Sequence, residues 1–87
     1  MYYYVYMLKV SSPLVKKTYV GYSIDIKKRL NKHNTNKGAK STRGYKWVLI
    51  YSKKFDNKSD ALSYEYKLKK NRLKRNSILI NFDKWNW

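Results

Sequence analysis

The sequence predicts a small α/β (α+β) fold in which a three-stranded, mainly antiparallel sheet is flanked by helices in the order β-β-α-β-α-α. Two observations support it. Segments rich in aromatic and β-branched residues, typical of strands, lie at 2–10, 15–22 and 45–52. Longer segments with apolar residues at helical spacing lie between and after them. Because the chain has 87 residues and no linker-like stretch, we expect one domain over 1–87.

The three strands differ in their expected surroundings. Residues 2–10 are apolar on both faces, which indicates a central strand. A Ser-Ser-Pro sequence ends this strand and the strand at 15–22 follows closely, so we expect a hairpin with a turn wider than two residues. A polar loop with two glycines precedes the third strand at 45–52.

The first helix carries polar residues on or beside its apolar face. Ser23 or Asp25 can cap this helix, which ends near His33. Its apolar positions are Ile26 and Leu30. Arg29 and His33 are four residues apart and therefore share a face that borders the sheet. In a structural interpretation, the arginine extends its charged end to solvent and the histidine lies at the helix end, where the helix dipole favours it. In a functional interpretation, both side chains take part in a site.

The second helix places a carboxylate in a similar position. Asn57 or Ser59 can cap it, and it ends near Lys70. Its apolar face is formed by Ala61, Leu62 and Leu68. Glu65, the one glutamate in the sequence, lies on or beside that face and needs a partner there. The alternatives are Lys69, one turn later, and a divalent cation.

A third helical stretch is expected near residues 73–81, where basic and apolar residues alternate. The aromatic residues of the tail, 81–87, have no assigned structure. The core of the domain is therefore expected over about 2–80.

The charge balance indicates a polyanionic partner. The chain has 21 Lys and Arg against 5 Asp and Glu, a net charge of +16, and such self-repulsion opposes compaction. Nucleic acid is the expected partner, because Lys and Arg release counterions from phosphates on binding. An anionic membrane surface is the alternative.

The composition excludes several classes of protein. Without cysteine the chain forms no disulfide, no thiolate zinc site and no cysteine nucleophile. It has no run of about 18 apolar residues and no signal-peptide pattern at its amino terminus. We therefore expect an intracellular protein that does not bind membranes. Its location would be the cytoplasm or nucleoid, or the nucleus or a viral replication site if its source is a eukaryote or a eukaryotic virus.

Five motifs in order resemble the GIY-YIG nuclease domain over roughly residues 2–80. They are Tyr4-Val5-Tyr6 with Tyr19-Val20-Gly21, Arg29 with His33, the stretch from Gly38 to Arg43, the strand from Trp47 to Tyr51, and the helix from Ala61 to Lys69. Tyr4 stands where the name-giving motif has glycine. The chain is similar to the small stand-alone, single-domain members, and also to the nuclease domain of the eukaryotic structure-specific endonuclease subunit.

The resemblance implies a metal-dependent DNA endonuclease that hydrolyses phosphodiester bonds, with selectivity for DNA structure, in repair or recombination. Glu65 would hold one Mg²⁺ or Mn²⁺. Tyr6 and Tyr19 would line the attacking side, and either could orient or deprotonate the water. Arg29 would stabilise negative charge on the phosphoryl group, and His33 would assist as a hydrogen-bond partner or proton relay. These five are the expected catalytic residues.

DNA contacts are expected from Lys40 and Arg43, in the loop after the first helix, and from Lys69. Many family members carry an asparagine after the glutamate, and here Asn71 and Asn76 are both available. A domain of this size would act with a targeting protein or a second copy. The alternative function is a nucleic-acid-binding module that keeps the scaffold but cleaves weakly or not at all.

Overall fold

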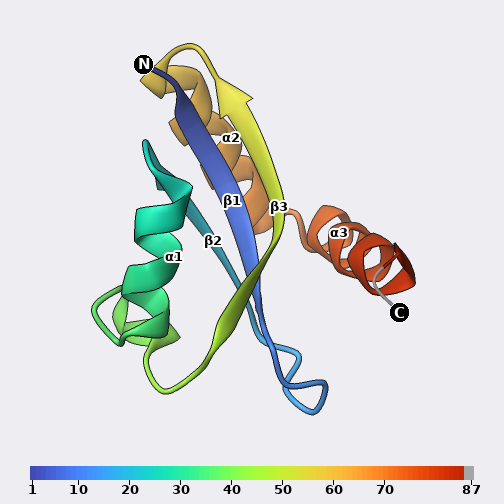
Figure 1. Cartoon of the computed structure of the whole chain (residues 1–87). Helices are drawn as coiled ribbons and strands as arrows, with labels where there is room; N and C mark the ends of the chain where they lie inside the picture. The colour runs from blue at the N-terminus through green and yellow to red at the C-terminus, as the bar shows by residue number, and fades with distance from the viewer. Residues whose placement is uncertain (86–87) are drawn as a thin grey trace.

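A computed structural model describes residues 1–85 of the chain. Its elements are β1 (Tyr3–Val10), β2 (Thr18–Ser23), α1 (Ile26–Asn34), a 3₁₀ turn η1 (Lys40–Thr42), β3 (Trp47–Phe55), α2 (Lys58–Lys70) and α3 (Arg72–Trp85). Strands and helices follow one another in the predicted order, and the strands form an antiparallel sheet, so the α+β fold class is confirmed (Figure 1).

The sheet has the order β2-β1-β3, which confirms β1 as the central strand. Its side chains alternate between two faces. Val5 and Met7 pack with residues of α2 and α3, whereas Tyr6 and Leu8 pack with residues of α1. All four are fully buried, because helices cover both faces of the central strand. The apolar character of both faces of this segment is thereby explained.

The hairpin between β1 and β2 is wider than the sequence indicates. We predicted a second strand from residue 15, but β2 begins at Thr18. Residues 11–17 form the loop, which the Val10 amide closes by donating to the carbonyl of Lys17. Beyond the loop, Tyr6 lies opposite Gly21. The motifs Tyr4-Val5-Tyr6 and Tyr19-Val20-Gly21 are therefore staggered, and Tyr4 lies opposite Ser23 instead.

Strand β3 starts and ends later than the predicted 45–52. Asn34, at the end of α1, fixes its start, since the Asn34 side chain accepts from the Trp47 amide and donates to the Trp47 carbonyl. A bulge follows, because Met7 lies opposite Tyr51 while Leu8 lies opposite Leu49. The extra residue reverses the alternation, so that Leu49 packs on the α1 side and Tyr51 on the α2 side.

The helix caps decide between the predicted alternatives. Asp25 caps α1 and Asn57 caps α2, each by accepting from a backbone amide of the first turn. Ala61 and Leu68 are buried as expected. Leu62 was wrongly assigned to the apolar face, since it is 40% exposed. The apolar face of α2 passes through Tyr64 instead, which packs against the buried cluster.

Helix α3 is longer than the predicted 73–81 and reaches Trp85, so most of the tail without assigned structure is helical. No glycine or proline interrupts this segment, and the Lys9 ammonium forms an ion pair with Asp83 at 2.9 Å. That pair ties the distal half of α3 to the end of β1. The two final residues, 86–87, lie outside the described part of the chain.

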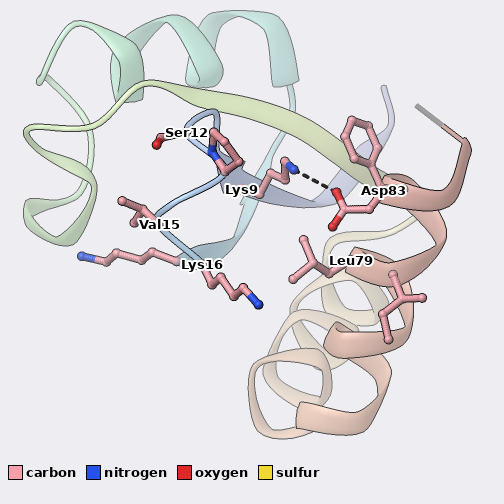
Figure 2. A pocket seen from close by; sticks show the side chains of 10 residues that line it. Lys9, Ser12, Val15, Lys16, Leu79 and Asp83 are labelled. Carbon is pink, nitrogen blue, oxygen red and sulfur yellow. Dashed lines mark hydrogen bonds and ion pairs between the residues drawn. The ribbon is translucent and has the colours of Figure 1, made fainter. Parts of the chain in front are cut away.

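A cleft of about 540 Å³ lies between the β1–β2 hairpin and α3, with the Lys9–Asp83 pair at its wall (Figure 2). Its lining includes Val15, Leu79 and Phe82 but none of the predicted catalytic residues. Within residues 1–85 no helix is both long and apolar enough to cross a membrane.

Candidate active site

Tyr6 lies at the centre of the candidate site. Its side chain is fully buried on the α1 face of the central strand, opposite Gly21. A Cβ atom at position 21 would lie 2.4 Å from the Tyr6 hydroxyl oxygen. Glycine is therefore required there by the close approach of the phenol, which explains the glycine of the second motif in this chain.

His33, near the end of α1, is also fully buried. Its Nε2 lies 2.9 Å from the Tyr6 hydroxyl oxygen, and its Nδ1 lies 2.9 Å from the hydroxyl oxygen of Thr42. Although His33 lies at a helix end, its side chain is not exposed to solvent. Both ring nitrogens are engaged, as a buried imidazole requires.

Burial and charge keep this pair neutral. Burial raises the pKa of Tyr6 above its ordinary value, and the nearby Arg29 guanidinium partly offsets that increase. Burial, together with the positive charge of Arg29, lowers the pKa of His33. At neutral pH the phenol is therefore protonated and the imidazole uncharged.

Arg29 lies one turn before His33 on α1, half-buried beside the two aromatic residues. Tyr6, and to a smaller extent Tyr19, raises the pKa of Arg29. Its Nε is the one buried side-chain nitrogen or oxygen within residues 1–85 that lacks a hydrogen-bond partner. A buried N–H of a permanent cation without an acceptor is costly in the free protein, and it fits an anionic ligand.

Tyr19 completes the group on the α1 side. Its ring centroid lies 4.8 Å from that of His33 and 6.4 Å from that of Tyr6. The structure thus brings four of the five predicted catalytic residues, Tyr6, Tyr19, Arg29 and His33, into direct proximity. They come from β1, β2 and α1.

Glu65 lies on α2, the helix on the other face of the sheet. Burial is the main cause that raises the pKa of Tyr6, and the negative charge of Glu65 adds to it. The Glu65 side chain is 18% exposed and forms an ion pair with Lys69 at 3.4 Å. Both predicted partners of this carboxylate are thus compatible with the geometry, because the pair with Lys69 leaves one carboxylate oxygen for another ligand.

A divalent cation fits this donor set if water and substrate complete its coordination. Residues 1–85 contain no cluster of three or more His, Cys, Asp or Glu side chains that could enclose a metal. Mg²⁺ commonly binds one or two carboxylates and keeps several waters, with phosphate oxygens supplied by the substrate. A single, partly exposed carboxylate with one oxygen not paired with Lys69 matches that mode of binding.

The predicted DNA contacts lie at two places. Lys40 and Arg43 are exposed at either end of η1, the turn that also carries Thr42. Lys69 is 51% exposed on α2. Of the two candidate asparagines, Asn71 is used as a cap, since its side chain accepts from the Lys74 amide at the start of α3. Asn76 is exposed.

Two residues of the site were missed by the sequence analysis. Thr42 and Gly38 lie in the stretch from Gly38 to Arg43, which we recognised without assigning them a role. Thr42 is fully buried against His33, and a Cβ at position 38 would lie 2.5 Å from His33 Nδ1. The available signal was that a buried histidine needs partners for both nitrogens, and that Thr42 is a small polar residue of the loop that follows His33.

Comparisons with known proteins agree with the resemblance. A family model described as the GIY-YIG catalytic domain matches residues 2–78. The UPF0213 protein SSP2268 of Staphylococcus saprophyticus is 43% identical over 67 residues, which cover 76% of this chain and 78% of that protein. The UPF0213 protein SAG0778 of Streptococcus agalactiae is 46% identical over 63 residues, covering 71% and 68%.

A solved structure is also similar. The solution NMR structure of the UPF0213 protein BH0048 from Bacillus halodurans shares 34% sequence identity with this chain at a TM-score of 0.54. The alignment covers 91% of this chain and 83% of that one. The two similar sequences and the similar solved structure are therefore all UPF0213 proteins.

Proposed function

Because the chain belongs to the GIY-YIG catalytic domain family, a family of nucleases, we propose that it is a metal-dependent endonuclease that hydrolyses phosphodiester bonds in DNA. One observation carries the proposal. A buried tyrosine–histidine pair lies beside an arginine whose Nε has no partner in the part of the chain that is described. This arrangement combines a group that can move a proton with a group that can receive a phosphate.

Arg29 binds the phosphoryl group in this proposal. Its uncommitted N–H would donate to a non-bridging oxygen and would stabilise the charge that develops there during attack. The pKa of His33 is lowered mainly by burial and further by the positive charge of Arg29, and phosphate binding would neutralise that charge. Substrate binding would thus make the imidazole a better base at the moment when it is needed.

Tyr6 is favoured over Tyr19 as the residue that activates water, because its hydroxyl is the one 2.9 Å from His33 Nε2. The attacking water gives a proton to the Tyr6 oxygen while the Tyr6 proton passes to His33. The resulting hydroxide forms the new bond to phosphorus, the bond to the 3′ oxygen breaks, and that oxygen takes a proton from solvent. Tyr19 orients the His33 ring and the water.

Glu65 would hold the divalent ion, Mg²⁺ or Mn²⁺. When bound, such an ion supplies a Lewis acid that stabilises the leaving 3′ oxygen. The i, i+4 contact with Lys69 places a cation beside the carboxylate in the absence of metal. Lys69 is then available to a DNA phosphate when the carboxylate is engaged elsewhere.

The finer part of the proposal concerns the substrate. Branched or single-stranded DNA in repair or recombination is favoured by the similarity to the structure-specific endonuclease subunit around His33 and Gly38. The exposed cations of η1, Lys40 and Arg43, would hold the strand near the cut. In the same proposal, a targeting protein or a second copy of the chain selects the DNA site that is cut.

Metal dependence tests the proposed function. Purified protein incubated with duplex, flap, junction and single-stranded DNA is expected to cleave at least one substrate with Mg²⁺ or Mn²⁺ and none with excess chelator. Adding back metal should restore cleavage, which separates metal dependence from damage by the chelator. If no substrate is cleaved in either metal while DNA is still bound, the protein is a binding module.

Salt dependence tests the DNA contacts. If Lys40, Arg43 and Lys69 each neutralise one phosphate, the logarithm of the association constant falls with log salt at a slope of about −2.7, at about −0.9 per contact. A fourfold rise in salt then weakens binding by about 40-fold. Fluorescence anisotropy of a labelled oligonucleotide measures this slope.

Matched variants assign the slope to residues. Lys40→Ala is expected to reduce the slope by about one, whereas Lys16→Ala, which removes an equal charge from the hairpin loop, should leave it unchanged. Equal reductions in both variants would show that the binding reflects net charge and not contacts made by the η1 turn.

A further inference from the structure

Thr42 is a fully buried polar residue in the turn η1, and it contacts His33 on the side away from Tyr6. Its hydroxyl oxygen lies 2.7 Å from the carbonyl oxygen of Ala39 and 2.9 Å from His33 Nδ1. The turn is held firmly, since the indole N–H of Trp47 donates to the Thr42 carbonyl. Thr42 therefore presents its hydroxyl to the histidine in one orientation.

Counting protons along this chain of contacts fixes their directions. A carbonyl oxygen can only accept, so the single hydroxyl proton of Thr42 is donated to Ala39. Toward His33 the Thr42 oxygen must then accept, which requires the proton of the neutral imidazole to be on Nδ1. Nε2 is left with a lone pair, and it can only accept from the hydroxyl of Tyr6.

We propose that Thr42 is a positioning residue that selects the Nδ1–H tautomer of His33, so that Nε2 can take the proton of Tyr6. The inference rests on the proposed function for its catalytic consequence. In the opposite tautomer, Nε2–H would donate to the Tyr6 oxygen and would occupy a lone pair that the attacking water needs. The pair could then not remove a proton from water.

Gly38 supports the same arrangement, because it also lies against Nδ1 of His33. A Cβ at this position would lie 2.5 Å from His33 Nδ1 and 3.1 Å from its Cγ. Any side chain at position 38 would therefore displace the ring or the turn. Because position 38 has no side chain, the Thr42 hydroxyl can contact Nδ1 of His33.

The chain contains one histidine, so its imidazole gives a single set of nuclear magnetic resonance signals. In a long-range proton–nitrogen correlation spectrum at pH 7.5, the wild type should show a protonated Nδ1 and an unprotonated Nε2. Thr42→Val, which keeps the shape but cannot accept, should lose this preference. Thr42→Ser, which keeps the hydroxyl, should retain it.

Cleavage is expected to follow the tautomer. The rate should fall about 10- to 100-fold in Thr42→Val, comparable with the loss of an outer hydrogen-bond partner of a metal-bound histidine. Thr42→Ser should restore most of the rate. A slower Thr42→Ser variant with the wild-type tautomer would mean that Thr42 acts through packing, and would overturn the proposal.

The spectrum also separates this inference from the proposed function. A wild-type protein with Nε2 protonated overturns the role of Thr42 whether or not DNA is cleaved, and needs no variant to fold. A wild-type protein with Nδ1 protonated, together with loss of that preference in Thr42→Val, supports the tautomer selection. Absence of cleavage in that same protein would count against the nuclease and not against the tautomer.

Discussion

Replacing Glu65 by glutamine is expected to reduce the rate of DNA cleavage by about 10³-fold or more. The amide keeps the shape of the side chain but removes the negative charge that would hold a divalent cation. A bound metal supplies several kcal/mol of charge stabilisation in the transition state, and about 1.4 kcal/mol corresponds to a factor of ten in rate. Single-turnover cleavage of the preferred substrate, measured at saturating Mg²⁺ or Mn²⁺, gives the effect.

The same variant should keep its fold and its affinity for DNA. The ion pair between Glu65 and Lys69 is partly exposed, and such pairs contribute at most about 1 kcal/mol to stability. Asp60→Asn, an exposed acid on the same helix, is the matched control and should cleave at the wild-type rate. Equal cleavage by Glu65→Gln and wild type would show that cleavage does not depend on Glu65 and would contradict its assignment as the metal ligand.

The central strand could be predicted from the sequence, and each helix cap could be narrowed to two candidates, because local chemistry determines these features. The apolar character of residues 2–10 on both faces requires cover on both sides. Asp25 and Asn57 each precede a helical segment with a side chain that accepts from the first turn. These features depend on neighbouring residues in the chain, and they recur in the structure almost unchanged.

The bulge in β3 could not be predicted in the same way. The alternation of residues 45–52 is compatible with a regular strand, and only pairing with β1 shows that Leu49 and Tyr51 face opposite sides. The exposure of Leu62 has a similar cause. Whether a leucine at the edge of a helical face is buried depends on what lies opposite, and here Tyr64 fills that place.

The candidate site was predicted residue by residue but not as a connected network. The resemblance placed Tyr6 and His33 in the site, and their types are consistent with proton transfer. The identity of the group behind His33 depends on the turn at 40–42, whose geometry is set by distant partners. The ammonium of Lys17 donates to the Ser41 carbonyl, and Trp47 holds the carbonyl of Thr42. Such contacts follow from the assembled fold.

Replacing Arg29 by methionine is expected to reduce the rate of cleavage by about 10² to 10³-fold, the loss typical of removing one donor that stabilises transition-state charge. Methionine retains an unbranched apolar side chain that can fill the place of the arginine stem. It also removes the buried Nε that has no partner in residues 1–85. Leaving such a group unpaired is unfavourable, so thermal stability should be unchanged or slightly higher in the variant.

Slower cleavage together with unchanged or higher thermal stability distinguishes a functional arginine from a structural one. An arginine retained for packing would, when replaced, lower the melting temperature and reduce activity in proportion. An arginine retained for a phosphate leaves the free protein strained and is relieved by substitution or by ligand. Arg29→Lys adds a further distinction, because lysine keeps the charge but lacks the planar donor pair, and we expect it to recover little of the rate.

Thermal unfolding with and without a short oligonucleotide completes the test, since DNA should stabilise the wild type more than Arg29→Met. Equal stabilisation of both proteins would mean that the uncommitted N–H does not meet the substrate.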